Sequence, residues 1–197
     1  MGTPEPRRLL KKLKTLRKSG KYEIYFEDEC HFQRSASIIR SWFMKGTTPE
    51  IKSPAVKEKI SIMGAVGADN GQLVTMETDI FNADSFKEFV AGLIRKAKTN
   101  KKILLVLDNA RFHHARINRN YLKSVKKKIE LLYLPAYSPE LNPIESFWKM
   151  TRRGVTHNRY FESLEQERSL LKSFFKKYEN RFNYWIWYCF FPANYGD

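Results

Sequence analysis

The feature of this sequence that most restricts its fold is an uninterrupted apolar run, Ile-Leu-Leu-Val-Leu at residues 103–107, which ends on Asp108. Such a run is typical of a central strand that helices cover on both faces. Before it, apolar side chains recur at the spacing of one helix face, with Ser85 and Glu88 as an expected capping box. The members of this face are Phe86, Phe89, Val90, Leu93, Ile94 and Ala97. The run and the helix predict an α/β fold with helices flanking a mixed sheet.

Turn residues and changes of hydrophobic period divide the rest of the chain into shorter elements. Further strands are predicted at residues 22–28, 37–44, 59–66, 71–79 and 129–134. The first four are expected to open the domain as an antiparallel meander. Further helices are predicted at residues 113–125 and 164–178, and another after the proline-rich loop 135–143, with Asn142 as its N-cap and Pro143 as its first residue.

Three acidic residues lie where this arrangement would place catalytic groups. Asp28 lies toward the end of the first strand, Asp108 ends the buried strand, and Glu145 lies in the first turn of the helix after the loop. Burying a carboxylate is costly unless it is paired or binds a cation. Carboxylate oxygens that meet at a strand end suit Mg²⁺. Two such ions about 4 Å apart activate a nucleophile and stabilise the leaving oxygen of a phosphoryl transfer.

Each acid also has an ordinary structural interpretation. Glu145 would complete a helix capping box. Asp108 would satisfy backbone groups of the next turn. Asp28, between Glu27 and Glu29, would be a charged strand end in water. Spacing alone leaves both interpretations open.

The segments around the acids are more specific than the acids themselves. They read Phe-Glu-Asp28-Glu-Cys, Leu-Asp108-Asn-Ala-Arg-Phe-His113 and Tyr-Ser-Pro-Glu-Leu-Asn-Pro-Ile-Glu145-Ser-Phe-Trp. These segments resemble the three acidic blocks of mariner-superfamily transposases, above all the bacterial insertion-sequence branch. Trp42 and Gly46, in Arg-Ser-Trp-Phe-Met-Lys-Gly, are similar to that branch too. The resemblance covers about residues 22–164, and the 36 residues between the second and third acids are typical of the branch.

The resemblance implies a ribonuclease-H-like catalytic domain, which we expect at residues 22–180. It implies two Mg²⁺ ions, replaceable by Mn²⁺, held by Asp28, Asp108 and Glu145. It further implies DNA strand cleavage at transposon ends, then attack of the freed 3′-hydroxyl on target DNA at TA sites, with no covalent enzyme intermediate. Because two transposon ends must be brought together, we expect a homodimer.

The charge of the chain is consistent with a DNA partner. The formal net charge is +15, and residues 1–21 hold eight basic residues against one acid. We interpret residues 1–21 as a basic linker or arm, either solvated or lying along a DNA backbone through residues such as Arg17 and Lys18. Its leucines, Leu9, Leu10, Leu13 and Leu16, recur as in one stripe of a short amphipathic helix.

Several neighbours of the acids are candidates for supporting roles. Lys149, Arg152 and Arg153 follow Glu145 and are predicted to contact phosphates, unless they form a solvated helix face. Asn109, His113 and Asn142 are predicted to border the cleft, with His113 touching a phosphate or a carboxylate. A zinc site from Cys30, His31, His113 and His114 is disfavoured, because no Cys/His pair has the spacing of a zinc finger.

The remaining features concern organisation and location. Full-length relatives carry an N-terminal helix-turn-helix region for which we see no room, so we expect a fragment or one part of a longer enzyme. Residues 181–197 form an aromatic C-terminal tail whose apolar run is too short to span a bilayer. Two cysteines and the lack of a recognisable signal peptide suit a bacterial cytoplasm, and no membrane partner is expected.

Two other functions stay open at this point. A catalytically silent DNA-binding remnant would keep the basic surface without turnover, although all three acids are intact. A related ribonuclease-H-like nuclease would share the fold but not the substrate, since fold does not determine function. The Ser-Pro-Glu-Leu-Asn-Pro-Ile-Glu block argues against that nuclease.

Overall fold

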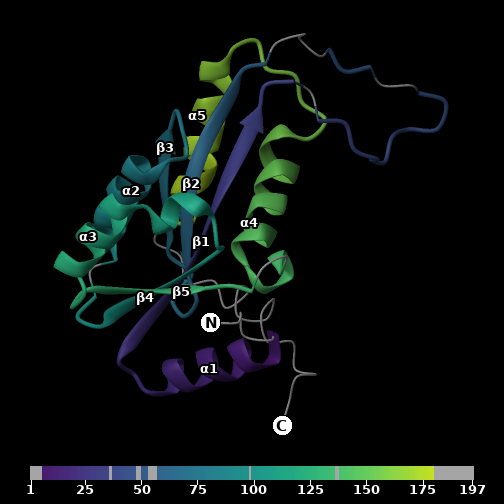
Figure 1. Cartoon of the computed structure of the whole chain (residues 1–197). Helices are drawn as coiled ribbons and strands as arrows, with labels where there is room; N and C mark the ends of the chain where they lie inside the picture. Colours follow the sequence, from purple (N-terminus) through teal and green to yellow (C-terminus); the bar gives the residue numbers. More distant parts are fainter. Residues whose placement is uncertain are drawn as a thin grey trace.

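A single five-stranded mixed sheet organises the described part of the chain (Figure 1). The computed structural model describes residues 6–35, 37–47, 50–52, 57–97, 99–135 and 138–179, so the predicted tail at 181–197 lies outside the described residues. The strands are β1 (Tyr22–Gln33), β2 (Lys59–Gly67), β3 (Leu73–Thr78), β4 (Lys102–Leu107) and β5 (Ile129–Tyr133). The sheet order is β3-β2-β1-β4-β5.

The strand directions divide the sheet into two halves. β1, β2 and β3 pair antiparallel, which confirms three of the four strands of the predicted meander. β4 pairs parallel with β1, and β5 pairs parallel with β4. The parallel half requires crossovers, and these contain the helices between the strands. The predicted mixed α/β architecture is therefore confirmed.

Helices cover both faces of the sheet. The α-helices are α1 (Pro6–Lys18), α2 (Ala83–Lys96), α3 (Arg116–Ser124), α4 (Ile144–Thr151) and α5 (Leu164–Lys176). Two short 3₁₀ turns, η1 (Arg111–His114) and η2 (Pro139–Leu141), precede α3 and α4, and a π-helical segment, η3 (Arg152–Thr156), extends α4. Side chains of α1, α4 and α5 share one hydrophobic core, and those of α2 and α3 share another on the opposite face.

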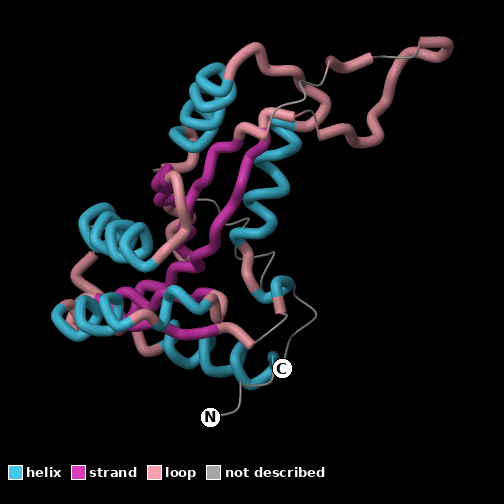
Figure 2. The backbone as a smooth tube through the Cα atoms, turned by 45° about the horizontal axis from the view of Figure 1, so that its top comes forward, coloured by secondary structure: helices cyan, strands magenta, loops and turns pink. Residues whose placement is uncertain are grey.

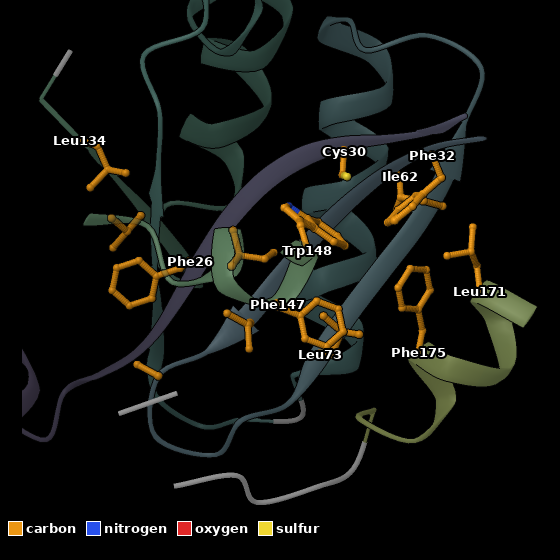
Figure 3. Packing of buried hydrophobic residues seen from close by; sticks show 14 of the residues in the cluster. Phe26, Cys30, Phe32, Ile62, Leu73, Leu134, Phe147, Trp148, Leu171 and Phe175 are labelled. Atoms are coloured by element: carbon orange, nitrogen blue, oxygen red, sulfur yellow. The ribbon is translucent and has the colours of Figure 1, made fainter. Parts of the chain in front are cut away.

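Alternation along β1 decides which side chain faces which core. Phe26, Cys30 and Phe32 enter the core with α4 and α5, whereas Tyr25 enters the core with α2. Figure 3 shows the first of these cores, in which Trp148 lies close to the side chains that β1 contributes. The face to which a β1 residue points therefore follows from whether its number is even or odd.

The segment between β1 and β2 differs from the prediction. The expected strand at residues 37–44 is absent from the described residues there, which contain one isolated bridge, Ser37 to His157. The reason is that β1 already pairs with β2 on one edge and β4 on the other, which leaves no free edge in the centre of the sheet. The described part of this segment projects from the body as a loop (Figure 2), and the Trp42 side chain is 99% exposed.

The predicted amphipathic N-terminal helix is present as α1. Its Leu9 and Leu13 are buried in the core that contains α4, and Leu16 packs against the same core. Residues 6–18 are thus attached to the sheet through an apolar stripe, whereas Arg8, Lys11, Lys12 and Lys14 are exposed. This part of the expected arm is a packed element of the domain.

The capping box of α2 consists of other residues than the predicted Ser85 and Glu88. Asn82 is the N-cap, and its Oδ1 accepts hydrogen bonds from the backbone N–H groups of Asp84 and Ser85. Ser85 is the third helical residue, whose Oγ accepts from the Asn82 N–H at 2.9 Å. The box is therefore closed by Asn82 and Ser85, and the helix begins earlier than expected.

None of the helices in the described ranges has the length and apolar content that a bilayer crossing requires.

Candidate active site

The three predicted acids come from three different elements. Asp28 lies within β1, Asp108 directly follows β4, and Glu145 is the second residue of α4. The parallel register of β1 and β4 ends at Phe26 opposite Val106, and Asp28 and Asp108 both lie two residues past that pair. The ends of two neighbouring parallel strands thus carry the first two acids to one region of the sheet.

The structure distinguishes Asp28 from the glutamates beside it. Asp28 has the even position that faces α4, and its Oδ2 accepts a hydrogen bond from Trp148 Nε1 at 3.1 Å. Glu27 and Glu29 have odd positions on the opposite face, where both lie near His113. Asp28 is therefore the β1 acid that shares a face with Glu145.

The Asp28 carboxyl is in an environment that opposes its ionisation. Its pKa is raised to about 7, first by burial and then by the negative charges of Glu145 and Glu29. The hydrogen bonds from Trp148 and from the backbone of Glu29 act in the opposite direction. A divalent cation would offset the repulsion between these carboxylates. The oxygen donors of Asp28 and Glu145 therefore fit a hard cation such as Mg²⁺.

The side chain of Asp108 is more exposed than its position after a buried strand predicted. Its side chain is 55% exposed, although residues 103–107 before it are buried. Burial stops at Leu107 because β4 ends there, and Asp108 starts the turn into η1. Its Oδ1 accepts a hydrogen bond from the Ala110 N–H at 2.9 Å. The predicted turn-capping contact is thus present, and the rest of the carboxylate is open to solvent and to ligands.

The predicted capping of α4 by Asn142 and Glu145 is absent from the structure. The N-cap of α4 is Pro143, which makes no side-chain capping bond, so Asn142 is not the cap. Asn142 is buried, and its Nδ2 donates to the Glu27 carbonyl at 2.8 Å. The amide therefore fastens the loop before α4 to β1, and no capping role accounts for Glu145.

Among the predicted supporting residues, His113 contacts both aromatic rings and a carboxylate. Its imidazole is buried, with its ring centroid 4.4 Å from that of Phe86 and 4.3 Å from that of Phe112. Its Nδ1 lies 3.5 Å from Asp108 Oδ1. Asn109 lies further out, with its Oδ1 2.6 Å from Nε2 of the exposed His114. The predicted contact between His113 and a carboxylate is therefore present.

The contacts of Glu27 and Glu29 with His113 were not predicted from the sequence. Nε2 of His113 lies 3.4 Å from Glu29 Oε1 and 3.9 Å from Glu27 Oε2. Burial and the charges of Glu29, Asp28 and Asp108 raise the pKa of Glu27 well above its ordinary value. The signal was available in the alternation of a strand with three consecutive acids, which must send the outer two to the same face.

The predicted phosphate-binding residues have different environments. Lys149, Arg153 and Lys18 are exposed. Arg152 is partly buried, since its Nη2 lies 2.9 Å from Cys30 Sγ and its guanidinium lies over the Phe32 ring. Arg17 forms an ion pair with Asp69. The exposed cations are thus the ones that are open to a phosphate.

Comparison with known families decides the classification. The sequence profile of the DDE superfamily endonucleases matches residues 23–168, which contain all three acids. The chain belongs to this family. The relationship that the three acidic blocks indicated is therefore confirmed.

One similar protein is encoded by an insertion element. The chain is 25% identical over 148 residues to an uncharacterized 39 kDa protein of the insertion element IS630 from Shigella sonnei, a match covering 75% of this chain and 43% of that protein. This DDE endonuclease chain therefore spans less than half of the length of that relative.

Solved structures with a similar fold include complexes of the Mos1 transposase. The Mos1 strand transfer complex aligns with a TM-score of 0.66 and 21% identity, covering 92% of this chain and 54% of the other. The mariner Mos1 paired-end complex with Mg aligns with a TM-score of 0.63 and 19% identity, covering 92% and 55%. At this identity the likeness concerns the fold, which confirms the ribonuclease-H-like assignment.

Proposed function

We propose that this chain is the catalytic domain of a transposase that cleaves DNA at transposon ends, with Asp28, Asp108 and Glu145 as its catalytic acids. The observation that carries the proposal is that Asp28 faces α4, the helix that contains Glu145, because Trp148 of α4 donates a hydrogen bond to Asp28 at 3.1 Å. Asp108 lies at the end of the neighbouring strand, and membership of the DDE endonuclease family supports the same assignment.

The proposed cofactor is a pair of Mg²⁺ ions, for which Mn²⁺ can substitute. Bound at the three acids, they would activate the attacking water or hydroxyl and stabilise the leaving oxygen of the phosphoryl transfer. The carboxylate donors suit this pair of hard cations, and a Mos1 complex of similar fold contains Mg. The electrostatic repulsion at Asp28 is the feature that a cation relieves.

The side chains around the acids hold them in position. Trp148 orients Asp28 through its Nε1–H, and the Ala110 N–H orients Asp108. Asn142 joins the loop before α4 to β1 and thereby sets the position of Glu145. We expect no covalent enzyme intermediate, because the acids do not need to act as nucleophiles.

The expected substrate is DNA, first the transposon ends and then target DNA at TA sites. The net charge of +15 favours a polyanion, and Lys149 and Arg153 present exposed cations next to the acids in the sequence. We expect the reaction to take place in the bacterial cytoplasm, where chromosomal and plasmid DNA are accessible.

The active form is proposed to be a homodimer. Two ends must be cleaved together, and large apolar side chains are exposed on the segment that projects between β1 and β2, as expected of an interaction surface. These side chains are Ile38, Trp42, Phe43 and Met44.

The proposal is tested with supercoiled plasmid in the presence and absence of Mg²⁺. We expect nicking by the wild-type chain and at least about 1,000-fold less by Asp108→Asn, which keeps the size of the side chain and removes a ligand charge. Asp79→Asn, a change at an exposed acid just after β3, serves as the matched control and should nick normally.

The outcomes separate the alternative functions. Plasmid retention without nicking, equal in wild type and Asp108→Asn, would support a silent DNA-binding protein. Cleavage confined to RNA–DNA hybrids would support a nuclease of the same fold. Loss of nicking in the Asp79→Asn control would show that the assay reports general damage to the fold.

A further inference from the structure

A second cluster of ionisable side chains lies on the face of β1 opposite to Asp28. It consists of Glu27, Glu29 and His113, which we call the rear cluster. Each offers one possible ligand atom, and these atoms lie within 4.8 Å of one another. Glu27 and His113 are each 1% exposed. The rear cluster is thus enclosed by the protein, whereas Asp108 of the candidate active site is open.

The rear cluster contains polar atoms with no hydrogen-bond partner among the described residues. They are both carboxylate oxygens of Glu27, Oε1 of Glu29 and Nε2 of His113. Leaving such atoms buried and unpaired is costly, most of all for carboxylates. Their number on one small site calls for a positively charged partner that contacts all three side chains at once.

The spacing of these atoms fits ligands around a metal ion better than hydrogen-bonded pairs. Nε2 of His113 lies 3.4 Å from Glu29 Oε1 and 3.9 Å from Glu27 Oε2. Hydrogen bonds between such groups are about 2.7–3.2 Å long. Ligand atoms about 2.0–2.2 Å from a tetrahedral metal ion are separated from each other by about 3.3–3.6 Å. The distance from His113 to Glu29 lies in this range, and the distance from His113 to Glu27 is slightly longer.

The other nitrogen of His113 supports the same interpretation. Nδ1 lies 3.4 Å from the Asp108 carbonyl oxygen, toward which a proton on Nδ1 would point. That tautomer leaves the Nε2 lone pair directed at the two glutamates, as in metal sites whose histidine is oriented through its second nitrogen. Phe86 and Phe112 pack on the ring and hold it in this orientation.

We propose that Glu27, Glu29 and His113 form a second metal site, distinct from the catalytic acids, that binds a transition-metal dication such as Zn²⁺. Two carboxylates and a neutral imidazole carry the charge that a dication balances. Imidazole nitrogen favours zinc and its first-row neighbours over Mg²⁺. The ion would connect β1 to η1 and so fix the turn that begins at Asp108.

This site differs from the zinc site that the cysteine and histidine spacing argued against. Cys30 faces the opposite side of β1, in the core with Trp148. The exposed His31 contacts Ser61 through Nδ1 at 3.0 Å, and Lys59 Nζ lies 3.4 Å from its Nε2. A cation there would face a lysine. Of those four residues, His113 alone belongs to the rear cluster, and its partners are glutamates.

The test uses Co²⁺ alone as the probe, added to the complete, chelator-treated chain without DNA. The parent protein is the Asp28→Asn/Asp108→Asn/Glu145→Gln variant, which removes the charge of all three proposed catalytic ligands and leaves the rear cluster intact. We expect one bound Co²⁺ with visible ligand-field absorption bands, and displacement of these bands by Zn²⁺. Nicking is not measured, so failure of the proposed transposase activity does not affect the result.

Substitutions in this parent identify the ligands. Adding His113→Gln or Glu27→Gln should weaken Co²⁺ binding by at least the ~10–100-fold that loss of an outer partner of a metal ligand costs. Adding His31→Gln should leave the binding unchanged and serves as the matched control. Co²⁺ binding that is absent from the parent, or unchanged by His113→Gln, overturns the proposal.

A second measurement covers variants that fail to fold. The parent that also carries His31→Gln is loaded with Mn²⁺, and pulsed electron paramagnetic resonance is used to detect nitrogen coupled to the metal. Imidazole nitrogen coupling supports the rear cluster, because none of the proposed catalytic ligands is a histidine. A spectrum with oxygen ligands only overturns it.

Discussion

Trp148 donates a hydrogen bond from Nε1 to Asp28 Oδ2 over 3.1 Å, and the indole is buried while it does so. Gly64 lies opposite Asp28 in the antiparallel register of β1 and β2. A Cβ at Gly64 would lie 2.6 Å from Trp148 Cη2. The bare backbone at Gly64 thus provides the space for the indole that orients a proposed catalytic carboxylate.

Trp148→Phe is expected to weaken the use of Mg²⁺ while keeping most of the packing. The hydrogen bond favours the charged form of Asp28, so its loss raises the pKa of Asp28 further above about 7. Hydrogen bonds to charged groups contribute ~1.5–3 kcal/mol, which corresponds to an increase of ~10-fold or more in the Mg²⁺ concentration for half-maximal nicking. Raising the pH should recover this deficit, because Asp28 then ionises. A deficit that is the same at every pH would argue for a purely structural role.

Gly64→Ala is expected to destabilise the fold by ~1–3 kcal/mol, the usual cost of overpacking a core. The added Cβ would meet Trp148 at 2.6 and 2.8 Å and Ile144 Cδ1 at 3.2 Å, so α4 must shift away from the sheet. The matched control is Gly92→Ala in α2, where the nearest atom is 3.9 Å away. That change should stabilise the helix by ~0.5–1 kcal/mol. Urea unfolding of both variants measures the difference, and equal stabilities would contradict the packing argument.

The sequence predicted correctly those elements whose hydrophobic period lies within their own residues. The apolar run at 103–107 and the helical stripe of α2 each contain their own period, and both elements are where the sequence indicated. The segment at 37–44 has strand-like composition too. Whether it pairs depends on an available edge of the sheet, and β2 and β4 occupy both edges of β1. Such competition between distant segments is not visible in the segment itself.

In the candidate site, too, some features follow from local sequence and others depend on distant segments. The acidic blocks predicted Asp28, Asp108 and Glu145 as site residues, but the exposure of Asp108 follows from where β4 ends. The contact between Trp148 and Asp28 joins residues 120 positions apart, so no local pattern could predict it. The convergence of His113 on two glutamates likewise requires the placement of η1 against β1.

Glu167 predicts a pH dependence of stability that is separate from the active site. It is fully buried in α5, and burial raises its pKa to about 7 from an ordinary value of 4.5, an effect that the charge of Arg34 partly opposes. The unfolded chain releases this proton near pH 4.5 and the folded chain near pH 7. The free energy of unfolding therefore falls as the pH rises between these values, by up to about 3 kcal/mol.

Glu167→Gln should remove the part of this slope that Glu167 contributes and stabilise the protein above pH 7, because the neutral amide does not ionise. Asp28, whose pKa is also raised to about 7, contributes to the slope that remains. Glu165→Gln on the same helix is the control, since Glu165 is exposed, and it should keep the slope. Urea unfolding between about pH 4 and pH 8 measures both. A slope that is equal in Glu167→Gln and in the wild-type chain would assign it to other groups.

Arg152 and Arg153 are adjacent in sequence but should respond differently to substitution. Arg153 is exposed, so Arg153→Gln should remove a phosphate contact and lower the salt slope of DNA binding by about 0.9. Arg152 is partly buried against Cys30 and the Phe32 ring, so Arg152→Gln should lower the melting temperature instead. Fluorescence anisotropy with a labelled duplex at several salt concentrations, together with thermal melting, separates the two effects. An unchanged salt slope in Arg153→Gln would place the DNA on another surface.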